Sequence, residues 1–406
     1  MGALAAWRRT RFCLLGAAAF SAALVVAMSG CVGAPPGPAP SSVFATQAAT
    51  ESLERGIQHF MEGGATSLVV QVRWPGGEWS KAYGVRNLDT QDPARPQDRV
   101  SVASITKSVV AVSVLKLVDQ GLIGLDDPVN GVLESFRNTL RPPGPITVRQ
   151  LLNHNSGLPD YGDAEYEAGP LKQVANTRLS MQRGLELAAT LPWEAKNVGR
   201  FSYSNSNYLA LGQLIEKLRG RPVGDVLNQD IFAPLGLQHT SLAEPDRGAP
   251  DNIHAYIMDG SERVDVTQAE VWVGSPAGGV ISTTQDINTF YLALLQGRLL
   301  SPAMLEEMKK KAGFAEYGLG LSRFPDACSG EFRYGHHGAI FGYMSISVTS
   351  ADGGSQVTMA MAVRPMPWQD PATARRIDLL GTQMEQAAQE TLDRLCQWSS
   401  SIGWRN

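Results

Sequence analysis

The chain has 406 residues, of which 43% are hydrophobic and 18% are charged, and its formal net charge is -4. This composition is typical of a soluble protein with enough apolar residues for one large domain or two lobes. The sequence pI of about 5.9 and the lack of a long run of lysine and arginine argue against nucleic-acid binding.

Residues 1–31 have the pattern of an export signal. Three arginines precede an apolar stretch from Phe12 to Met28, and the segment ends in small residues before Cys31. This ending resembles the lipobox of bacterial lipoproteins, in which the cysteine is lipidated. We therefore expect export to the outer face of the cell membrane, with the lipid on Cys31 as the only membrane attachment. An ordinary cleaved signal, which would give a secreted protein, and an uncleaved anchor are the alternatives.

Residues 32–45 are rich in proline, glycine and serine at their start, a composition typical of a flexible tether. A helix is predicted next, from Thr46 to Glu62. Two strands are predicted after it, Ser67–Trp74 and Glu78–Val85, because the turn residues Pro75-Gly76-Gly77 separate two strand-like runs. The mature chain is therefore expected to open with a helix and a hairpin.

The segment Ser104-Ile105-Thr106-Lys107 carries a hydroxyl and an amine three residues apart, and an almost wholly apolar run to Val118 follows it. A helix this apolar must be buried, and positions i and i+3 lie roughly 5–6 Å apart on one face. Burial disfavours the ammonium form, so a neutral Lys107 can take the Ser104 proton. The positive end of the helix dipole favours the negative charge that develops on Ser104. The pattern predicts a serine nucleophile activated without histidine; a capping serine followed by a surface lysine is the alternative.

From Leu125 to about Asn288, helical patterns alternate with loops rich in proline and glycine. Helices are predicted from Thr147, from about Asn207, and over Thr284–Leu295. Tyr203-Ser204-Asn205 comes just before the second of these. A phenol beside a lysine can exchange protons with reacting groups, and a carboxamide can hold both the lysine and a substrate amide. The alternative is that these three residues only cap the helix.

Strand patterns return near the C-terminus, and a long amphipathic helix is predicted over Ala372–Cys396. The strand-like segments are Tyr317–Leu321, Arg333–Gly335, Met344–Thr349 and Gln356–Val363. Strands at both ends of a chain with a helical middle predict an α+β fold. We expect one antiparallel sheet built from both ends and flanked by helices, with an inserted, mainly helical lobe over about residues 122–290.

His336-His337-Gly338 lies on or beside one of the predicted strands. Glycine in a strand lets a ligand or another backbone approach closely. The edge of such a strand can pair with an extended peptide, and a backbone N–H there can complete an oxyanion hole. The alternative is a loop histidine pair without a role.

Cys328 and Cys396 are the two cysteines that lie beyond the export signal. An even pair in an exported protein favours a disulfide over two free thiols. The six histidines show no spacing typical of metal ligands, so no metal and no other cofactor is predicted.

Taken together, the three motifs resemble those of penicillin-recognising serine hydrolases, the group that includes class C β-lactamases, D-alanyl-D-alanine carboxypeptidases and related esterases. The resemblance extends from about Thr46 to the C-terminus, and we expect residues 46–398 to form the β-lactamase-like domain. Further matching segments follow in order, at Ile146–Tyr161, Phe232–Leu242, Pro276–Asp286 and Tyr317–Leu321.

This resemblance implies a role for each motif residue. It makes Ser104 the nucleophile, Lys107 the proton acceptor, Tyr203 the acid and base, and Asn205 the contact to the substrate amide. His336, His337 and Gly338 correspond to the third motif of the family, and the N–H groups of Ser104 and Ala339 would form the oxyanion hole. It also supports the Cys328–Cys396 disulfide, which recurs in some D,D-carboxypeptidases.

One departure from the family pattern concerns the third motif. Where β-lactamases carry a lysine, this chain has His336, and histidine is mostly neutral near pH 7. This resembles the carboxypeptidase branch more than the true β-lactamases. Arg323 is a candidate for the cation that would hold the substrate carboxylate, although it lies one residue beyond the expected place. Trp272 is a candidate for the wall of the cleft, with core packing as the alternative.

The resemblance thus implies an exported serine hydrolase, most simply a D-alanyl-D-alanine carboxypeptidase that forms an acyl-enzyme on Ser104. Its partners would be a peptidoglycan stem peptide or a β-lactam, and a monomer is expected. A β-lactamase or an esterase of the same family is the alternative, and a non-catalytic scaffold with this fold is a third. No G-x-S-x-G segment is present, which excludes the nucleophile elbow of α/β-hydrolases.

Overall fold

The computed structural model describes residues 42–165, 170–242, 249–267, 269–313, 315–367 and 370–401. The predicted export signal, Cys31 and the first part of the predicted tether lie outside these residues. Among the described helices, none combines the length and the apolar character that a membrane crossing needs.

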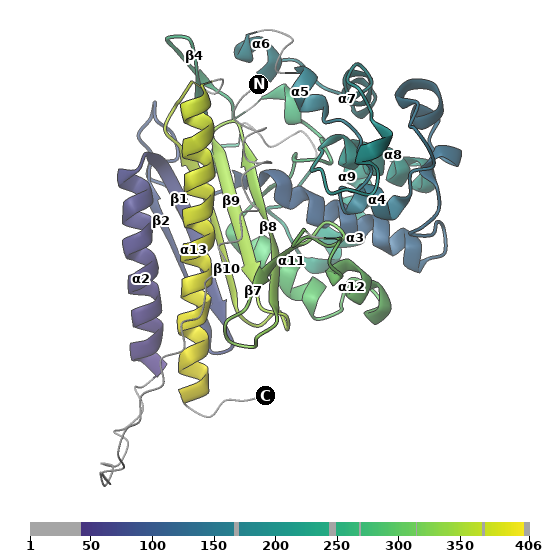
Figure 1. The fold of residues 1–406 in the computed structure, drawn as a ribbon. Coiled ribbons are helices and arrows are strands. Elements are labelled where there is room, and N and C mark those ends of the chain that lie inside the picture. Colours follow the sequence, from purple (N-terminus) through teal and green to yellow (C-terminus); the bar gives the residue numbers. More distant parts are fainter. Residues whose placement is uncertain are drawn as a thin grey trace, which may run out of the picture.

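A six-stranded antiparallel sheet is built from both ends of the chain (Figure 1), in the order β2-β1-β10-β9-β8-β7. Its strands are β1 (Ala65–Trp74), β2 (Gly77–Gly84), β7 (Ser322–Pro325), β8 (Phe332–Ile340), β9 (Tyr343–Thr349) and β10 (Gln356–Val363). The N-terminal hairpin joins the C-terminal strands because β1 pairs with β10, from Ala65 opposite Val363 to Arg73 opposite Gln356. The expected α+β architecture is confirmed.

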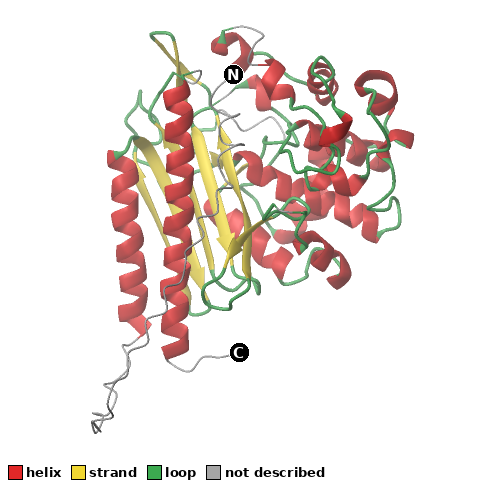
Figure 2. Ribbon diagram, viewed as in Figure 1, coloured by secondary structure: helices red, strands yellow, loops and turns green. Residues whose placement is uncertain are grey.

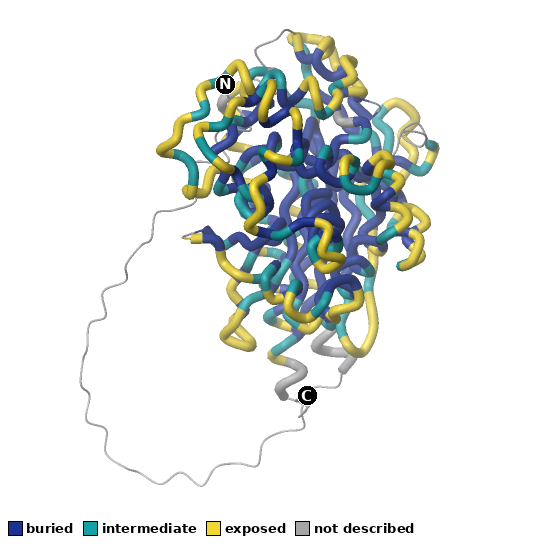
Figure 3. Tube along the Cα trace, turned by 90° about the vertical axis from the view of Figure 1, so that its right-hand side faces the viewer, coloured by how far each residue is buried: buried dark blue, intermediate teal, exposed yellow. Residues whose placement is uncertain are grey.

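Helices cover both faces of this sheet (Figure 2). On one face, α2 (Ser42–Glu62) and α13 (Pro371–Ser401) lie side by side, while α11 (Thr284–Leu295) packs against the other face. Strands β1 and β10 are therefore buried on both faces, which explains their nearly continuous apolar sequence. Figure 3 shows the buried residues as a continuous region through the middle of the molecule.

The helical part of the molecule lies between the two groups of strands in the sequence. Its helices are α3 (Thr106–Asp119), α4 (Val148–Leu152), α5 (Tyr161–Glu165), α6 (Leu171–Ala175), α7 (Met181–Ala188), α8 (Ser206–Arg219), α9 (Val223–Leu227), α10 (Ala233–Leu235) and, after α11, α12 (Pro302–Lys309). Two short ribbons accompany them, β3 (Val100–Ser101) with β6 (Ile281–Ser282) and β4 (Tyr256–Asp259) with β5 (Glu262–Asp265). The buried helix α3 packs against α8, so the S-x-x-K segment and the Tyr-Ser-Asn segment lie at the amino ends of neighbouring helices.

Three predicted elements differ most from the structure. Strand β8 covers Phe332–Ile340, where we predicted only Arg333–Gly335. Helix α2 begins at Ser42, so the last residues that we assigned to the tether are helical. The predicted strand at Tyr317–Leu321 makes one strand-like bridge, from Tyr317 to Ser322, and is otherwise irregular, because other backbone bonds of the segment run to helices. Gly320 N donates to the Leu152 carbonyl, Leu319 N donates to the Met308 carbonyl, and Gly320 has a φ of +75° that only glycine adopts readily.

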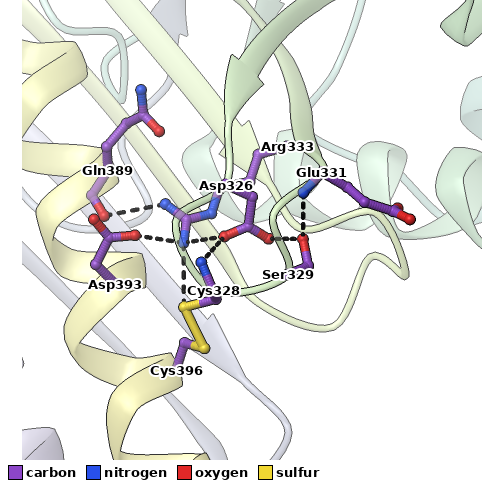
Figure 4. Close-up of a disulfide and its surroundings, with 8 residues drawn as sticks. All are labelled: Asp326, Cys328, Ser329, Glu331, Arg333, Gln389, Asp393 and Cys396. Carbon is purple, nitrogen blue, oxygen red and sulfur yellow. Dashed lines mark hydrogen bonds and ion pairs between the residues drawn. A yellow bond between two sulfur atoms is a disulfide. The ribbon is translucent and has the colours of Figure 1, made fainter.

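A disulfide joins Cys328, in the connection between β7 and β8, to Cys396 on α13. Figure 4 shows Arg333 beside it, with its guanidinium between the carboxylates of Asp326 and Asp393, each at 2.7 Å. Asp326, Cys328 and Asp393 are close enough together to hold a metal ion, but the cationic Arg333 lies between the carboxylates and the sulfur is in the disulfide. The cluster therefore fastens α13 to the sheet.

Candidate active site

Ser104 lies in the 3₁₀ turn η1 (Ala103–Ile105) directly before α3. We expected one continuous helix; instead Ala103 has a left-handed φ of +49° and bends the chain just before the serine. Such a conformation costs a non-glycine residue about 1–2 kcal/mol, and residues of this kind cluster at functional sites. The bend places Ser104 at the amino end of α3, where backbone dipoles favour negative charge.

Lys107, in the first turn of α3, is fully buried. Its Nζ lies 3.0 Å from Ser104 Oγ, 2.8 Å from Asn205 Oδ1 and 2.5 Å from the Ala277 carbonyl oxygen. The carboxamide oxygen and the carbonyl oxygen can only accept hydrogen bonds, so each takes an N–H of the lysine. The remaining position on Nζ points at the serine hydroxyl.

Asn205 is held so that its oxygen faces the lysine. Its Nδ2 donates to Asp160 Oδ2 at 3.1 Å, and its backbone N–H donates to the same oxygen at 3.1 Å. A carboxylate only accepts, so the amino group of the carboxamide must lie toward Asp160 and the oxygen toward Lys107. Asp160 is buried, and we did not predict its role, although it lies in the family-like segment Ile146–Tyr161.

Tyr203 covers the lysine from the helical side of the site. Lys107 Nζ lies 5.0 Å from the centroid of its ring, and the ring of His336 lies 6.5 Å away, centroid to centroid. The structure therefore brings the three predicted motifs together, although they are far apart in the sequence.

His336 is buried and points to the same side of the sheet as Tyr203. Its Nδ1 lies 2.5 Å from the His337 carbonyl oxygen, which can only accept, so Nδ1 carries the proton. Its Nε2 then accepts a hydrogen bond from the Tyr317 hydroxyl at 2.9 Å. Burial lowers the pKa of His336 to about 3, against the opposing effect of the His337 carbonyl. The imidazole is therefore neutral throughout the physiological pH range.

The side chain of His337 is not part of this group. Successive residues of a strand face opposite sides of the sheet, and His337 Nε2 lies 2.8 Å from Glu385 Oε2 on α13, which covers the other face. We assigned His337 to the substrate-binding third motif, but its side chain lies on the other side of the sheet from Tyr203 and His336. What this position contributes to the site is its carbonyl, which orients His336.

Gly338 lies where β8 contacts Val102 and Ala103, the two residues before Ser104. A β-carbon at this position would come within 2.4 Å of the Val102 carbonyl oxygen and 2.3 Å of Ser345 Oγ. Strand β8 can therefore approach the turn that carries Ser104 this closely only with glycine at position 338. Ala339 follows in β8, and the role of its N–H in an oxyanion hole stays a prediction.

Arg323 lies on β7, with its guanidinium turned away from this group. It lies opposite Tyr334, its guanidinium lies 3.8 Å from the centroid of the Phe332 ring, and its Nε is 3.8 Å from Glu316 Oε2. Phe332 is four residues before His336 in β8, which is about 13 Å along a strand. In this orientation Arg323 offers no cation beside His336, and its predicted contact with a substrate carboxylate stays a prediction. Trp272 lies in η7 (Glu270–Trp272), but its side chain is outside the described part of the chain.

Residues that we did not predict also contact this group, among them His154, Asp160, Ala277 and Tyr317. All four belong to segments that carry the family resemblance, Ile146–Tyr161, Pro276–Asp286 and Tyr317–Leu321. That resemblance was therefore the available signal. These residues contact the predicted group from segments that are distant in the sequence, so no local sequence pattern predicts their roles.

A serine hydroxyl 3.0 Å from a buried lysine amine, beneath a phenol and beside an antiparallel sheet packed against helices, is the arrangement of a serine hydrolase in which a lysine can take the place of the usual histidine base. The chain belongs to the beta-lactamase family, whose model matches residues 53–383.

Known proteins of several kinds are similar to the chain. A penicillin-binding protein of Bacillus subtilis is 27% identical over 241 residues, which are 55% of this chain and 51% of that protein. The chain spans about half to two thirds of the length of the curated relatives that it matches first.

Solved structures match over more of their length. A D-stereospecific amidohydrolase from Streptomyces sp. is 30% identical, with a TM-score of 0.68 over 83% of this chain and 99% of that one. The D-amino acid amidase of Ochrobactrum anthropi has the same fold, with a TM-score of 0.68 at 23% identity over 84% of this chain and 99% of that one.

Proposed function

We propose that the protein hydrolyses amide bonds of D-configured substrates through an acyl-enzyme on Ser104, and that it prefers substrates without a carboxylate next to the scissile bond. The single observation that carries this preference is the neutral third motif. His336 is buried, bonded to Tyr317 and uncharged, while Arg323 lies over Phe332.

The contacts of Lys107 support its role as the base. A neutral amine has two N–H groups and one lone pair. Asn205 Oδ1 and the Ala277 carbonyl take the two N–H groups, so the lone pair lies toward Ser104 Oγ at 3.0 Å. In this form the serine hydroxyl donates to Lys107, which is the arrangement that proton transfer needs.

The reaction proceeds in two halves. Ser104 Oγ attacks the amide carbonyl carbon as its proton passes to Lys107, and the oxyanion is held by backbone N–H groups, for which we propose those of Ser104 and Ala339. One such donor is commonly worth about 3–4 kcal/mol. The C–N bond then breaks as Tyr203 passes a proton to the leaving amine and takes up the proton that Lys107 received from Ser104, so that both groups regain their starting protonation. Water attacks the acyl-enzyme in the second half, its proton returns through the same groups, and Ser104 is regenerated.

The candidate substrates differ in whether they carry a negative charge beside the scissile bond. A carboxypeptidase and a β-lactamase both act beside a carboxylate, which a cation normally pairs with. A buried neutral imidazole offers no cation to such a carboxylate, whereas an amide or an ester without a carboxylate needs no cation. The 30% identity to a D-stereospecific amidohydrolase supports the same reading.

A matched pair of peptides tests this preference. Diacetyl-Lys-D-Ala-D-Ala and its C-terminal carboxamide share the D-Ala–D-Ala bond and differ in the terminal carboxylate. Cleavage of that bond is followed by release of D-alanine or of D-alanine amide, which separates it from hydrolysis of the terminal carboxamide. We expect kcat/KM for the carboxamide to be equal or higher, and Ser104→Ala to abolish both. A carboxylate form cleaved much faster would overturn the preference and leave the D-alanyl-D-alanine carboxypeptidase as the function.

The carboxypeptidase is retained as the second candidate because a penicillin-binding protein is among the relatives. Intact-protein mass spectrometry after incubation with penicillin, run beside nitrocefin hydrolysis, separates it from a β-lactamase. A stable adduct on Ser104 favours a penicillin-binding enzyme, and rapid nitrocefin turnover favours the lactamase.

Export, the lipid on Cys31 and the monomeric state are proposed from the sequence alone. Palmitate labelling of the wild type and of Cys31→Ser tests the anchor: label on both proteins, or on neither, contradicts it. Light scattering of the purified protein tests the monomer.

A further inference from the structure

His154 follows α4 and lies, fully buried, beneath the site. Its backbone has a left-handed φ of +60°. Histidine tolerates this region better than most residues with a β-carbon, yet a strained backbone persists only where its surroundings hold it in place. The contacts of His154 show what holds it.

Both neighbours of Tyr203 bond to this one residue. The backbone N–H of Ser202 donates to the His154 carbonyl at 2.8 Å, and the backbone N–H of Ser204 donates to His154 Nδ1 at 3.2 Å. The chain on either side of the phenol-bearing residue is thus fixed to the same histidine.

The protonation of His154 follows from its neighbours. Asn207 Oδ1 accepts from Ser156 Oγ at 2.6 Å, so the amino group of Asn207 is the part that faces His154 Nδ1, at 3.1 Å. With Ser204 N–H and Asn207 Nδ2 both donating, Nδ1 is the acceptor and Nε2 carries the proton. His154 is therefore a neutral acceptor here.

The imidazole also packs on the phenol itself. The ring centroids of His154 and Tyr203 lie 4.1 Å apart with a tilt of 30°, close to an offset stack. The rings of Tyr208 and Tyr317 lie 5.4 Å and 5.2 Å from His154. Tyr317 in turn bonds His336, so this cluster joins the second and third motifs.

We propose that His154 is a positioning residue for Tyr203, with two separable parts. Its Nδ1 and carbonyl fix the backbone of Tyr203, and its ring fixes the plane of the phenol over Lys107. The inference rests on the proposed acyl-enzyme mechanism, in which Tyr203 transfers protons.

Two variants separate the parts. His154→Asn keeps an acceptor near the position of Nδ1 and suits a positive φ, but it removes the ring. His154→Phe keeps a ring and removes the acceptor from two buried donors. We expect His154→Asn to fold with a lower melting temperature, because the missing ring leaves a cavity, and to lower kcat by about 10- to 100-fold, with KM little changed. His154→Phe should lower both stability and kcat.

A double-mutant cycle distinguishes positioning from a general structural role. The readout is acylation of Ser104 by D-alanine p-nitroanilide, whose leaving amine needs the proton that Tyr203 supplies. Labelling by a fluorophosphonate probe, whose fluoride leaves without a proton, shows that Ser104 is still reactive. If His154 acts through Tyr203, His154→Asn slows acylation in the wild type but has little further effect in a Tyr203→Phe background.

The outcomes separate the two proposals. Additive effects of the two substitutions, or a wild-type rate in His154→Asn, overturn the positioning role. A wild-type protein that both reagents fail to acylate overturns the acyl-enzyme mechanism itself.

Discussion

Thr106 Oγ1 accepts a hydrogen bond from the backbone N–H of Val280 at 3.0 Å. Thr106 lies between the serine and the lysine of the S-x-x-K motif, and Val280 ends the loop that begins at Pro276. Ala277, in the same loop, presents the carbonyl that accepts from Lys107. A side chain inside the motif thus holds the loop that directs the lysine.

The substitution Thr106→Val tests this connection. It keeps the shape of the side chain but leaves the buried Val280 N–H without its acceptor, which costs about 1–3 kcal/mol of folding free energy. We expect kcat for ester or amide hydrolysis to fall more than KM changes, because the Ala277 carbonyl shifts relative to Lys107. Thr106→Ser retains the acceptor and is the matched control. Equal kinetics in the two variants would contradict the role.

Gly338 and Gly278 both lie close to Ala103 in space and provide a second pair of matched substitutions. A β-carbon at Gly338 would meet the Val102 carbonyl oxygen at 2.4 Å, whereas one at Gly278 would meet only ordinary contacts of 3.7 Å or more. We expect Gly338→Ala to push β8 away from the serine turn and to lower Ser104 acylation by at least about tenfold. Gly278→Ala should keep near wild-type acylation and stability. Probe labelling of both variants checks this, and an active Gly338→Ala protein would show that β8 does not need its close approach.

His336 predicts a specific dependence of stability on pH. Burial lowers its pKa from 6.5 to about 3 in the folded state, so between these values the unfolded chain binds a proton that the folded chain does not. The contribution of His336 is complete above pH 6.5 and is lost as the pH falls toward 3. The expected loss between pH 8 and pH 5 is about 2 kcal/mol.

Urea unfolding at these two pH values, for the wild type and for His336→Gln, measures this term. Glutamine does not titrate and can still accept from Tyr317, so the variant should lose less stability over the same interval. Parallel pH dependences in the two proteins would exclude a buried neutral imidazole.

The Cys328–Cys396 bridge is expected to stabilise the fold without serving the reaction. It closes a loop with a sequence separation of 68 residues. The chain-entropy estimate for such a loop is about 4 kcal/mol. We expect the double variant with both cysteines replaced by serine to unfold at lower denaturant concentration and to keep its rate of Ser104 acylation.

Dithiothreitol provides the control for this prediction. It should lower the unfolding midpoint of the wild type and leave that of the double variant unchanged. A large loss of acylation in a fully folded double variant would assign the bridge a role in the site.

Local patterns in the sequence predicted much of the fold. Alternating and apolar runs predicted β1, β2, β9 and β10, and α11 spans the predicted residues, Thr284–Leu295. These elements were predictable because hydrophobic periodicity and turn residues act within a few positions. The segment Tyr317–Leu321 misled us because an apolar, aromatic run has the same composition whether it pairs with a strand or packs on helices.

The sequence by itself determined that Ser104 and Lys107 meet, since three residues separate them, and the motif resemblance placed Tyr203, Asn205 and His336 nearby. Only the tertiary structure decided which side chains face the site. His337 turns to α13 and Arg323 to Phe332, while His154, Asp160 and Ala277 come in from distant segments. The physical reason is that a strand changes face at every residue, and that hydrogen bonds between distant segments depend on packing, which no local pattern encodes.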